Sequence, residues 1–117
     1  MAPEWYARPV LFVSDLERSV GFYRDQLGFE ERWRHEMVVA QVDRSSCEVI
    51  LCAQEPAKLG RGRVFISLDV DVLRAVRTEL EGKGVAVEDG WWGYPLMVVR
   101  DPDGNELYFP YPADPSR

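Results

Sequence analysis

The stretch RPVLFVSDLERSVGFYRDQLGF, residues 8–29, sets the pattern that the rest of the chain repeats. Residues 8–13 are rich in β-branched and aromatic side chains and are expected to form a strand. Ser14, followed three residues later by Glu17, has the capping-box pattern that predicts a helix start at Ser14. An apolar stripe with helical spacing follows, formed by Leu16, Val20, Tyr23 and Leu27. Gly28 is placed to end this helix in a left-handed conformation.

Three short strands are expected after the helix, at residues 29–34, 37–43 and 47–53. Each run is rich in Val, Ile or aromatic residues and is bounded by polar turns. The first half of the chain is therefore expected to be a βαβββ module over residues 7–53. A polar, glycine-containing stretch over residues 54–62 is expected to be a linker.

The same order of elements is expected again in a second module over residues 63–111. Its elements are a strand at 63–69, a helix at 71–81, and strands at 85–88, 96–100 and 106–110. Two pairs of residues support this repeat, because Asp15 and Asp71 are separated by 56 positions, as are Gly28 and Gly84.

The turn between the last two expected strands is DPDG, residues 101–104, a sequence typical of β-hairpins. Two βαβββ modules in one chain predict an α+β fold in which a curved mixed sheet surrounds a cleft. We expect residues 1–117 to form a single domain, with a ligand on the concave face that the helices leave open. A ferredoxin-like βαββαβ fold is the alternative, but it leaves the third strand of each half unexplained.

Charge and hydropathy restrict the partners of the protein. The formal net charge of −6 and the sequence pI near 4.8 disfavour binding to nucleic acid. No run approaches the roughly 20 apolar residues that span a membrane, and the first residues do not resemble a secretion signal. Cys47 and Cys52 are five positions apart in one expected strand, so their side chains point to opposite faces and should remain free thiols. These features predict a cytoplasmic protein.

Four short motifs span most of the chain: VSDLERS at 13–19, FY at 22–23, LGF at 27–29 and RDPDGN at 100–105. They resemble the opening and the closing hairpin of the superfamily of glyoxalases, bleomycin-resistance proteins and extradiol dioxygenases, also called the vicinal oxygen chelate superfamily. The resemblance implies paired βαβββ modules that form a cleft, commonly in a homodimer. It does not give the function, because this superfamily includes isomerases, transferases, oxygenases and binding proteins.

The metal-dependent members of this superfamily are similar in placing ligands on the first and last strands of each module, usually His on the first and Glu on the last. The corresponding positions here are Arg8, Val64, Cys52 and Tyr108. Arg8 and Val64 cannot donate a lone pair to a metal. Cys52 and Tyr108 are poor ligands for hard ions until they lose a proton. We therefore expect no metal and no cofactor.

Two carboxylates weigh against that expectation. Glu106 shares a strand face with Tyr108, and Glu48 shares one with Cys52, so an alignment shift of two residues brings both carboxylates in as ligands. They supply oxygen donors alone, which disfavours zinc and iron. The single histidine, His35, lies away from the ligand strands and is expected to be a surface residue.

Aromatic residues mark the expected ligand site. Trp92-Gly93 before the closing turn and Trp33 after LGF resemble aromatic positions of bleomycin-resistance proteins, although one extra residue before the turn leaves open whether Trp91 or Trp92 faces the cleft. The predicted ligand-binding residues are Trp33, Met37, Trp92, Tyr94 and Tyr108. Planar side chains stack on flat ligands, and carboxylates offset the positive charge of a basic ligand. The alternative is that Trp33 and Trp92 seal a dimer interface.

Two functions are compatible with these residues. The first is metal-free binding of a flat or cationic, drug-like small molecule by a homodimer, as in antibiotic resistance. The second is an enzyme of the glyoxalase, lyase or dioxygenase type, with Glu106 as base and Tyr108 or His35 as proton donor. The absence of the usual metal ligands favours the binding protein.

Overall fold

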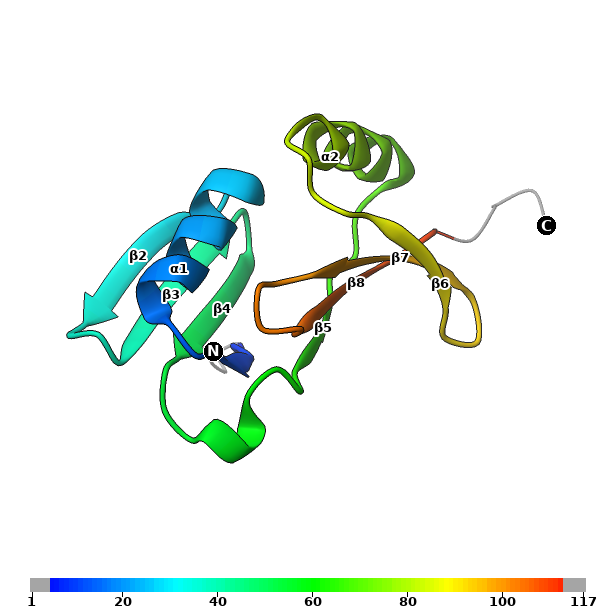
Figure 1. Ribbon diagram of the computed structural model, residues 1–117. Coiled ribbons are helices and arrows are strands. Elements are labelled where there is room, and N and C mark those ends of the chain that lie inside the picture. Colours follow the sequence, from blue (N-terminus) through cyan, green and yellow to red (C-terminus); the bar gives the residue numbers. More distant parts are fainter. Residues whose placement is uncertain (1–4, 113–117) are drawn as a thin grey trace.

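The first βαβββ module is present in the computed structural model, which describes residues 5–112 (Figure 1). Its elements are β1 (Val10–Phe12), α1 (Leu16–Gly21), the π-helical turn η1 (Phe22–Gln26), β2 (Glu30–His35), β3 (Val39–Arg44) and β4 (Cys47–Cys52). The strands form one sheet in the order β1-β4-β3-β2, in which β1 and β4 are parallel and the other pairs are antiparallel. A short 3-10 helix, η2 (Pro56–Lys58), lies in the expected linker.

The second module has the same topology. Its elements are β5 (Arg63–Phe65), α2 (Val70–Gly82), β6 (Glu88–Trp91), β7 (Pro95–Arg100) and β8 (Glu106–Pro110). Its sheet has the order β5-β8-β7-β6, with β5 and β8 parallel. The expected α+β fold with two βαβββ modules is therefore confirmed, although the strands form two separate four-stranded sheets. The ferredoxin-like alternative is wrong, because all four strands of each module are paired.

The first helix begins one residue later than predicted. Its N-cap is Asp15, whose side chain accepts a hydrogen bond from the backbone N–H of Arg18 at 3.0 Å. The predicted capping box at Ser14 is wrong, because the Ser14 hydroxyl donates to Asp103 of the second module at 2.6 Å instead. A contact with a distant turn thus decides between two adjacent residues that both suit an N-cap.

The helical segment also changes its hydrogen-bonding pattern before it ends. After α1 the backbone N–H of Leu27 reaches the carbonyl of Phe22, which is the wider spacing of a π-helix. Tyr23 in this segment is fully buried, as the apolar stripe predicts. Gly28 ends the segment with φ of +74°, which confirms its predicted role.

The second helix shows that the repeat is not exact. It begins at Val70, one residue before the predicted start at 71, and its N-cap is Asp69, while Gly84 follows its end with φ of +77°. The stretch from cap to glycine is therefore two residues longer than the corresponding stretch from Asp15 to Gly28.

Two strands of the second module differ from their predicted positions. The strand expected at 63–69 ends at Phe65, and the strand expected at 85–88 is found at Glu88–Trp91. The apolar residues of the misassigned stretches lie outside the strands and are partly buried against the core; they are Ile66, Leu68, Val85 and Val87. These residues are therefore hydrophobic because they pack on the core, and not because they belong to a strand. The backbone N–H of Ile66 still donates to the carbonyl of Tyr108 in β8 at 2.8 Å.

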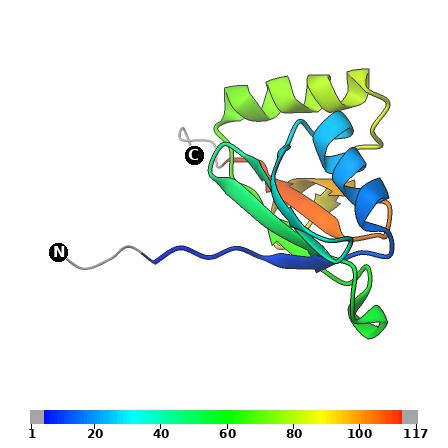
Figure 2. The same cartoon turned by 90° about the vertical axis from the view of Figure 1, so that its left-hand side faces the viewer.

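One hydrophobic core joins the two modules. It includes side chains from α1 and α2 and the inner faces of both sheets, among them Val20, Tyr23, Val42, Leu51, Leu80, Val99 and Leu107. Successive strand residues alternate between faces, so the outer face of each sheet lies away from this core. In the rotated view of Figure 2 the chain before β1 extends away from the body as an arm, on which Trp5 is 99% exposed.

The turn between β7 and β8 is held by the buried carboxylate of Asp101. It accepts hydrogen bonds from the backbone N–H groups of Asp103 and Asn105 and from the Asn105 side chain, each at 2.9 Å. A fourth hydrogen bond comes from the Tyr23 hydroxyl of the first module at 3.1 Å. Burial raises the pKa of Asp101, although the hydrogen bonds favour its ionised form.

The same turn also contacts the start of the first module. The Asn105 side chain donates to the carbonyl of Phe12 at 3.0 Å. Asp103 accepts from the Ser14 hydroxyl and is paired with Arg18 at 3.2 Å. The DPDGN sequence therefore forms the predicted hairpin and fastens the second module to the first.

Gly60 lies against this turn and is predicted to be intolerant of a side chain. Its φ is +68°, and an added Cβ would stand 2.2 Å from the backbone oxygen of Asp103. Gly60→Ala is expected to lower the free energy of unfolding by about 2 kcal/mol or more, measured by urea denaturation. Gly82→Ala is the matched control, because nothing lies within 4 Å of its added Cβ. If both variants unfold at the same urea concentration, the close approach of linker and turn is not present.

Candidate functional site

Three aromatic rings form a cluster on the outer face of the second sheet. Phe65 lies 5.1 Å from Tyr108 and 5.9 Å from Trp92, and Trp92 lies 5.8 Å from Tyr108, between ring centroids. The register pairs β5 with β8 so that Phe65 stands beside Tyr108, while Trp92 comes from the β6–β7 connection. We call Phe65, Trp92 and Tyr108 the aromatic cluster. Phe65 and Trp92 remain 43% and 47% exposed, so their rings are available to a ligand.

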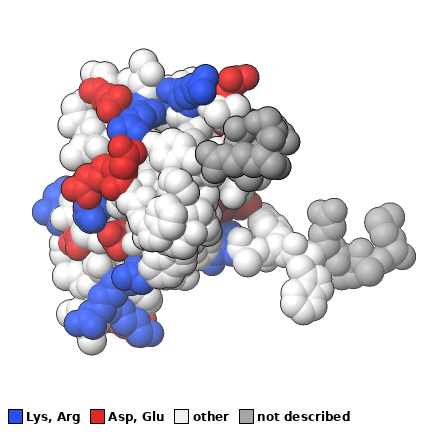
Figure 3. All heavy atoms as spheres, turned by 90° about the vertical axis from the view of Figure 1, so that its right-hand side faces the viewer, with Lys and Arg blue, Asp and Glu red and all other residues white. Residues whose placement is uncertain are grey.

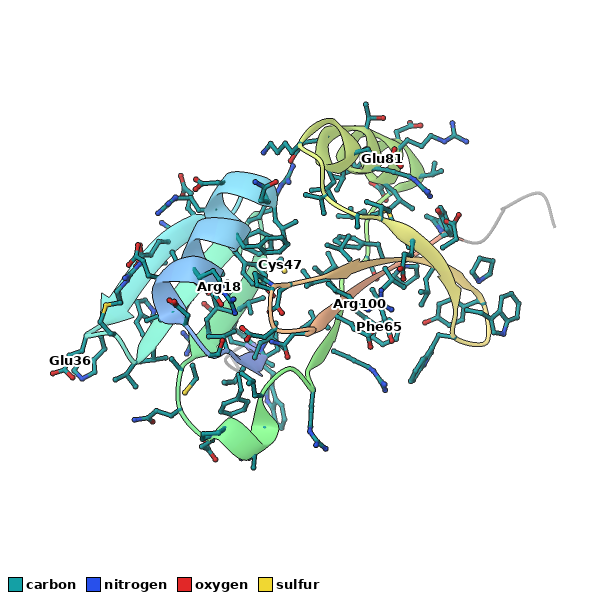
Figure 4. The ribbon with its side chains drawn as sticks, viewed as in Figure 1. Arg18, Glu36, Cys47, Phe65, Glu81 and Arg100 are labelled. Carbon is teal, nitrogen blue, oxygen red and sulfur yellow. The ribbon has the colours of Figure 1, made fainter. Side chains whose placement is uncertain are left out.

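The aromatic cluster lies on a largely uncharged side of the molecule. Figure 4 shows Phe65 and Arg100 on the side of the second sheet away from α2. Figure 3, seen from the right of Figure 1, shows a broad uncharged area with charged side chains at its edges. The exposed rings of Phe65 and Trp92, bordered by charged side chains, are typical of a binding surface.

Glu106 connects the cluster to two cations. It accepts a hydrogen bond from the Tyr108 hydroxyl at 2.9 Å, and it pairs with Arg63 and Arg100, each at 3.2 Å. Burial by itself would raise the pKa of Glu106, but these donors outweigh it and hold the pKa below its usual value. Burial and the hydrogen bond to Glu106 raise the pKa of Tyr108. Glu106 is therefore an ionised acceptor that already has three donors.

This ion cluster gives the protein an acid-sensitive contribution to stability. Because the pKa of Glu106 is lower in the folded state than in the unfolded state, its contribution is complete above the unfolded pKa and is lost as the pH falls through the folded pKa. The stability difference between wild type and Glu106→Gln should be larger near neutral pH than at about pH 3 in urea denaturation. An equal difference at both pH values would contradict the ionised, paired state.

Arg63 shows how the cluster accepts a cation. Its guanidinium carbon lies 5.2 Å from the Trp92 ring centroid while the same group pairs with Glu106. Ring faces attract cations through the quadrupole of the π-system. The ring face of Trp92 therefore suits a flat group that carries positive charge.

The outer face of the first sheet is polar and is centred on Gln41. The Gln41 side-chain oxygen accepts from Arg8 at 2.7 Å and from the Trp33 indole N–H at 2.9 Å. Its amide donates to Asp43 at 3.1 Å and to Glu48 at 2.8 Å. We call these five residues the Gln41 network. All four contacts fix the amide orientation of a side chain that is 3% exposed.

The predicted ligand-binding residues fall into two groups. Trp92 and Tyr108 are in contact on the second sheet, and Tyr94 lies in the same β6–β7 connection. Trp33 and Met37 belong to the first module, Trp33 in β2 and Met37 in the turn that follows it. Within residues 5–112 no hydrogen bond or ring contact joins the two groups. One chain therefore does not bring the predicted residues into a single crevice.

The structure distinguishes the two adjacent tryptophans. Trp92 contacts Phe65 and Tyr108, whereas Trp91 is 72% exposed and has no ring contact in the described part of the chain. Trp92 is thus the residue that belongs to the aromatic cluster.

Two important positions were missed by the sequence reasoning. Phe65 joins the aromatic cluster, and the signal for it was the alternation of Arg63, Val64 and Phe65 along a strand. Gln41 is the centre of the polar network, and its signal was the alternation of apolar and polar residues over AQVD, residues 40–43.

The residues at the expected metal positions do not fit a metal. Val64, one of the positions that correspond to metal ligands of the superfamily, is paired with Leu107 and packs on the core. Arg63 and Phe65 occupy the outer-face positions of that strand, and neither coordinates a cation. Among residues 5–112 no group of three His, Cys, Asp or Glu side chains lies close enough to hold an ion.

The candidate catalytic residues are also separated. Glu106 and Tyr108 are in contact on the second sheet, whereas His35 is exposed at the end of β2 in the first module. An acid–base pair within one chain can therefore come from Glu106 and Tyr108 but not from His35.

Comparison with known proteins identifies the family. Residues 5–109 match the sequence profile of the Glyoxalase/Bleomycin resistance protein/Dioxygenase superfamily. The chain belongs to this superfamily. In this glyoxalase-superfamily protein, the motifs that resemble the superfamily form parts of the two βαβββ modules and the closing DPDGN hairpin. No curated protein sequence matches the chain significantly.

Several solved structures have the same fold as this glyoxalase-superfamily protein. A bleomycin-binding protein from Streptomyces verticillus, complexed with copper(II)-bleomycin, has a TM-score of 0.75 and 23% identity, covering 97% of this chain and 100% of that one. The antibiotic-binding protein TnmS3 from a Streptomyces strain has a TM-score of 0.74 and 24% identity, covering 97% and 99%. A lactoylglutathione lyase from Agrobacterium tumefaciens has a TM-score of 0.71 and 19% identity, covering 93% and 95%. At these identities the similarity establishes the fold.

In the described residues of this glyoxalase-superfamily protein, no helix is both long enough and apolar enough to cross a membrane.

Proposed function

We propose that the protein is a metal-free, cytoplasmic binding protein for a flat or cationic small molecule, which stacks on the aromatic cluster. The observation that carries this proposal is the pair of half-exposed rings, Phe65 and Trp92, beside the ionised Glu106. Arg63 already places a guanidinium against Trp92, so the ring attracts positive charge. The structural similarity to a bleomycin-binding and an antibiotic-binding protein supports a ligand of drug-like size.

A second copy of the chain is needed to complete this site. The aromatic cluster is open, and Trp33 and Met37 belong to the other module. A homodimer in which the first sheet of one copy faces the second sheet of the other brings both groups together. The exposed Trp5 on the arm before β1 gives further apolar surface for such contact.

The test is a titration of intrinsic tryptophan fluorescence with acriflavine, a flat aromatic cation, together with sedimentation to measure mass. Saturable quenching, with about one ligand per chain and a dimeric mass, is the expected result. Absence of quenching at tens of micromolar by this and other flat cations overturns the binding proposal. A monomeric mass at the same protein concentration overturns the shared site.

One observation favours an enzyme instead. Tyr108 donates to Glu106 at 2.9 Å, a contact suited to proton transfer, and a lactoylglutathione lyase has the same fold. Against this role, the Glu106 carboxylate already accepts from three donors, and these hold its pKa below the usual value. A carboxylate with a lowered pKa is a weak base. Turnover of an aldehyde, epoxide or catechol that survives chelation and is lost in Glu106→Gln supports the enzyme. Absence of turnover with all three leaves the binding protein.

A further inference from the structure

A cavity of about 380 Å³ lies between the two modules, on the opposite side of the second sheet from the aromatic cluster. Phe109 of β8 lines it, whereas its neighbour Tyr108 points to the aromatic cluster. The other walls come from the β3–β4 turn of the first module and from α2. In Figure 4, Cys47 at this turn lies between the first sheet and the second module. The cavity is therefore separate from the proposed ligand site.

The walls of this junction cavity are mainly apolar. They include Phe29, Cys47, Val72, Val76, Leu80 and Phe109. The cavity opens to solvent, since Val72 at its wall is 47% exposed. Its volume falls within the range of small-molecule sites.

The polar groups at the junction cavity carry no net charge. Arg44 forms two hydrogen bonds with Glu79 of α2, at 2.8 and 2.9 Å, and a third with the carbonyl of Leu27 at 2.8 Å. The hydrogen bond from Arg44 lowers the pKa of Glu79, so the two charges cancel. Ser45, Ser46 and Ser67 also line the cavity, and their hydroxyls have no hydrogen bond within residues 5–112.

We propose that this junction cavity is a second ligand site, which takes a small uncharged molecule of two or three rings with a polar group close to Ser45 and Ser46. A neutral ligand follows from the balanced Arg44–Glu79 pair, because a charged one would have no counter-ion. The size of two or three rings follows from the volume of about 380 Å³, which lies at the lower end of the range of small-molecule sites. The Arg44–Glu79 pair connects the end of β3 to α2 beside the cavity.

The experiment uses N-phenyl-1-naphthylamine, an uncharged apolar fluorophore, with the full-length protein. Its emission should rise saturably with about one probe per chain. Val72→Trp fills the cavity from α2 and is expected to weaken probe binding about tenfold. Val70→Trp is the matched control, because Val70 is similarly exposed on the same helix but does not line the cavity. Equal affinity of both variants overturns the site.

Thiol protection gives an independent readout that does not depend on the variants. Cys47 lines the junction cavity and Cys52 does not, and both are free and partly buried. Saturating probe should slow iodoacetamide labelling of Cys47 about fivefold and leave Cys52 unchanged, as resolved by peptide mass mapping. Equal protection of both thiols, or of neither, overturns the proposal. Probe binding that is seen at low protein concentration but is lost at high protein concentration also overturns the proposal, because a second copy of the chain then covers the cavity.

The two ligand sites can be told apart. Trp92→Ala should leave the affinity for N-phenyl-1-naphthylamine unchanged, because the aromatic cluster lies on the other face of the sheet. Loss of both acriflavine and probe binding in Trp92→Ala assigns the probe to the aromatic cluster and overturns the second site. Failure of acriflavine to bind wild type overturns the proposed function and leaves the cavity test intact.

Discussion

Replacing Trp92 with alanine is expected to weaken binding of a flat cationic ligand about 30-fold, because loss of a central aromatic residue commonly costs about 2 kcal/mol or more. Trp92 contacts both other members of the aromatic cluster and keeps 47% of its surface exposed. Its removal takes away a stacking surface and also leaves Phe65 and Tyr108 less well supported. Calorimetric titration of both proteins with acriflavine measures the loss, and urea denaturation checks that the variant is folded.

Trp91→Ala is the matched control for this prediction. Trp91 has the same side chain at the next position, but it is 72% exposed and has no ring contact among residues 5–112. Its replacement is expected to change the affinity by less than about twofold. A loss in Trp91→Ala equal to that in Trp92→Ala would show that the ligand does not stack on the aromatic cluster.

Asp101→Ala is expected to lower the free energy of unfolding by about 3 kcal/mol or more, because several buried donors lose their acceptor together. The carboxylate accepts hydrogen bonds from Asp103, from Asn105 twice and from Tyr23. Without it the β7–β8 turn loses its internal support and its contact with the first module. Urea denaturation followed by circular dichroism measures the difference.

Tyr23→Phe separates the two parts of this effect. It removes the hydrogen bond between the modules and keeps the three hydrogen bonds inside the turn. The expected cost is about 1 kcal/mol, the usual value for one hydrogen bond. If Tyr23→Phe is as damaging as Asp101→Ala, the turn is stabilised through the module contact rather than through its own backbone.

Much of the fold could be predicted because local patterns agree with the tertiary structure. The positive φ of Gly28 and Gly84 and the hairpin at DPDG follow from residues that favour those conformations. The start of the first helix could not be predicted, since Ser14 and Asp15 both suit an N-cap and the contact with distant Asp103 decides between them.

The candidate site was harder to predict because it depends on strand register. A shift of one residue moves a side chain to the opposite face, which is why the spacing gives Val64, rather than Arg63 or Phe65, as the position that corresponds to a metal ligand of the superfamily. Strand pairing over 43 positions brings Phe65 beside Tyr108, and no local pattern specifies that partner. The separation of Trp33 from Trp92 likewise depends on how the two modules pack, which the repeat alone does not determine.

The docking of the β7–β8 turn on the start of the first module means that the halves are joined in space as well as along the chain. A backbone cut in the 3-10 segment Pro56–Lys58 would leave the contacts of Asp101 with Tyr23 and of Asn105 with Phe12 in place. Two fragments produced separately should therefore reassemble, and their affinity for each other would report the strength of that docking without any ligand.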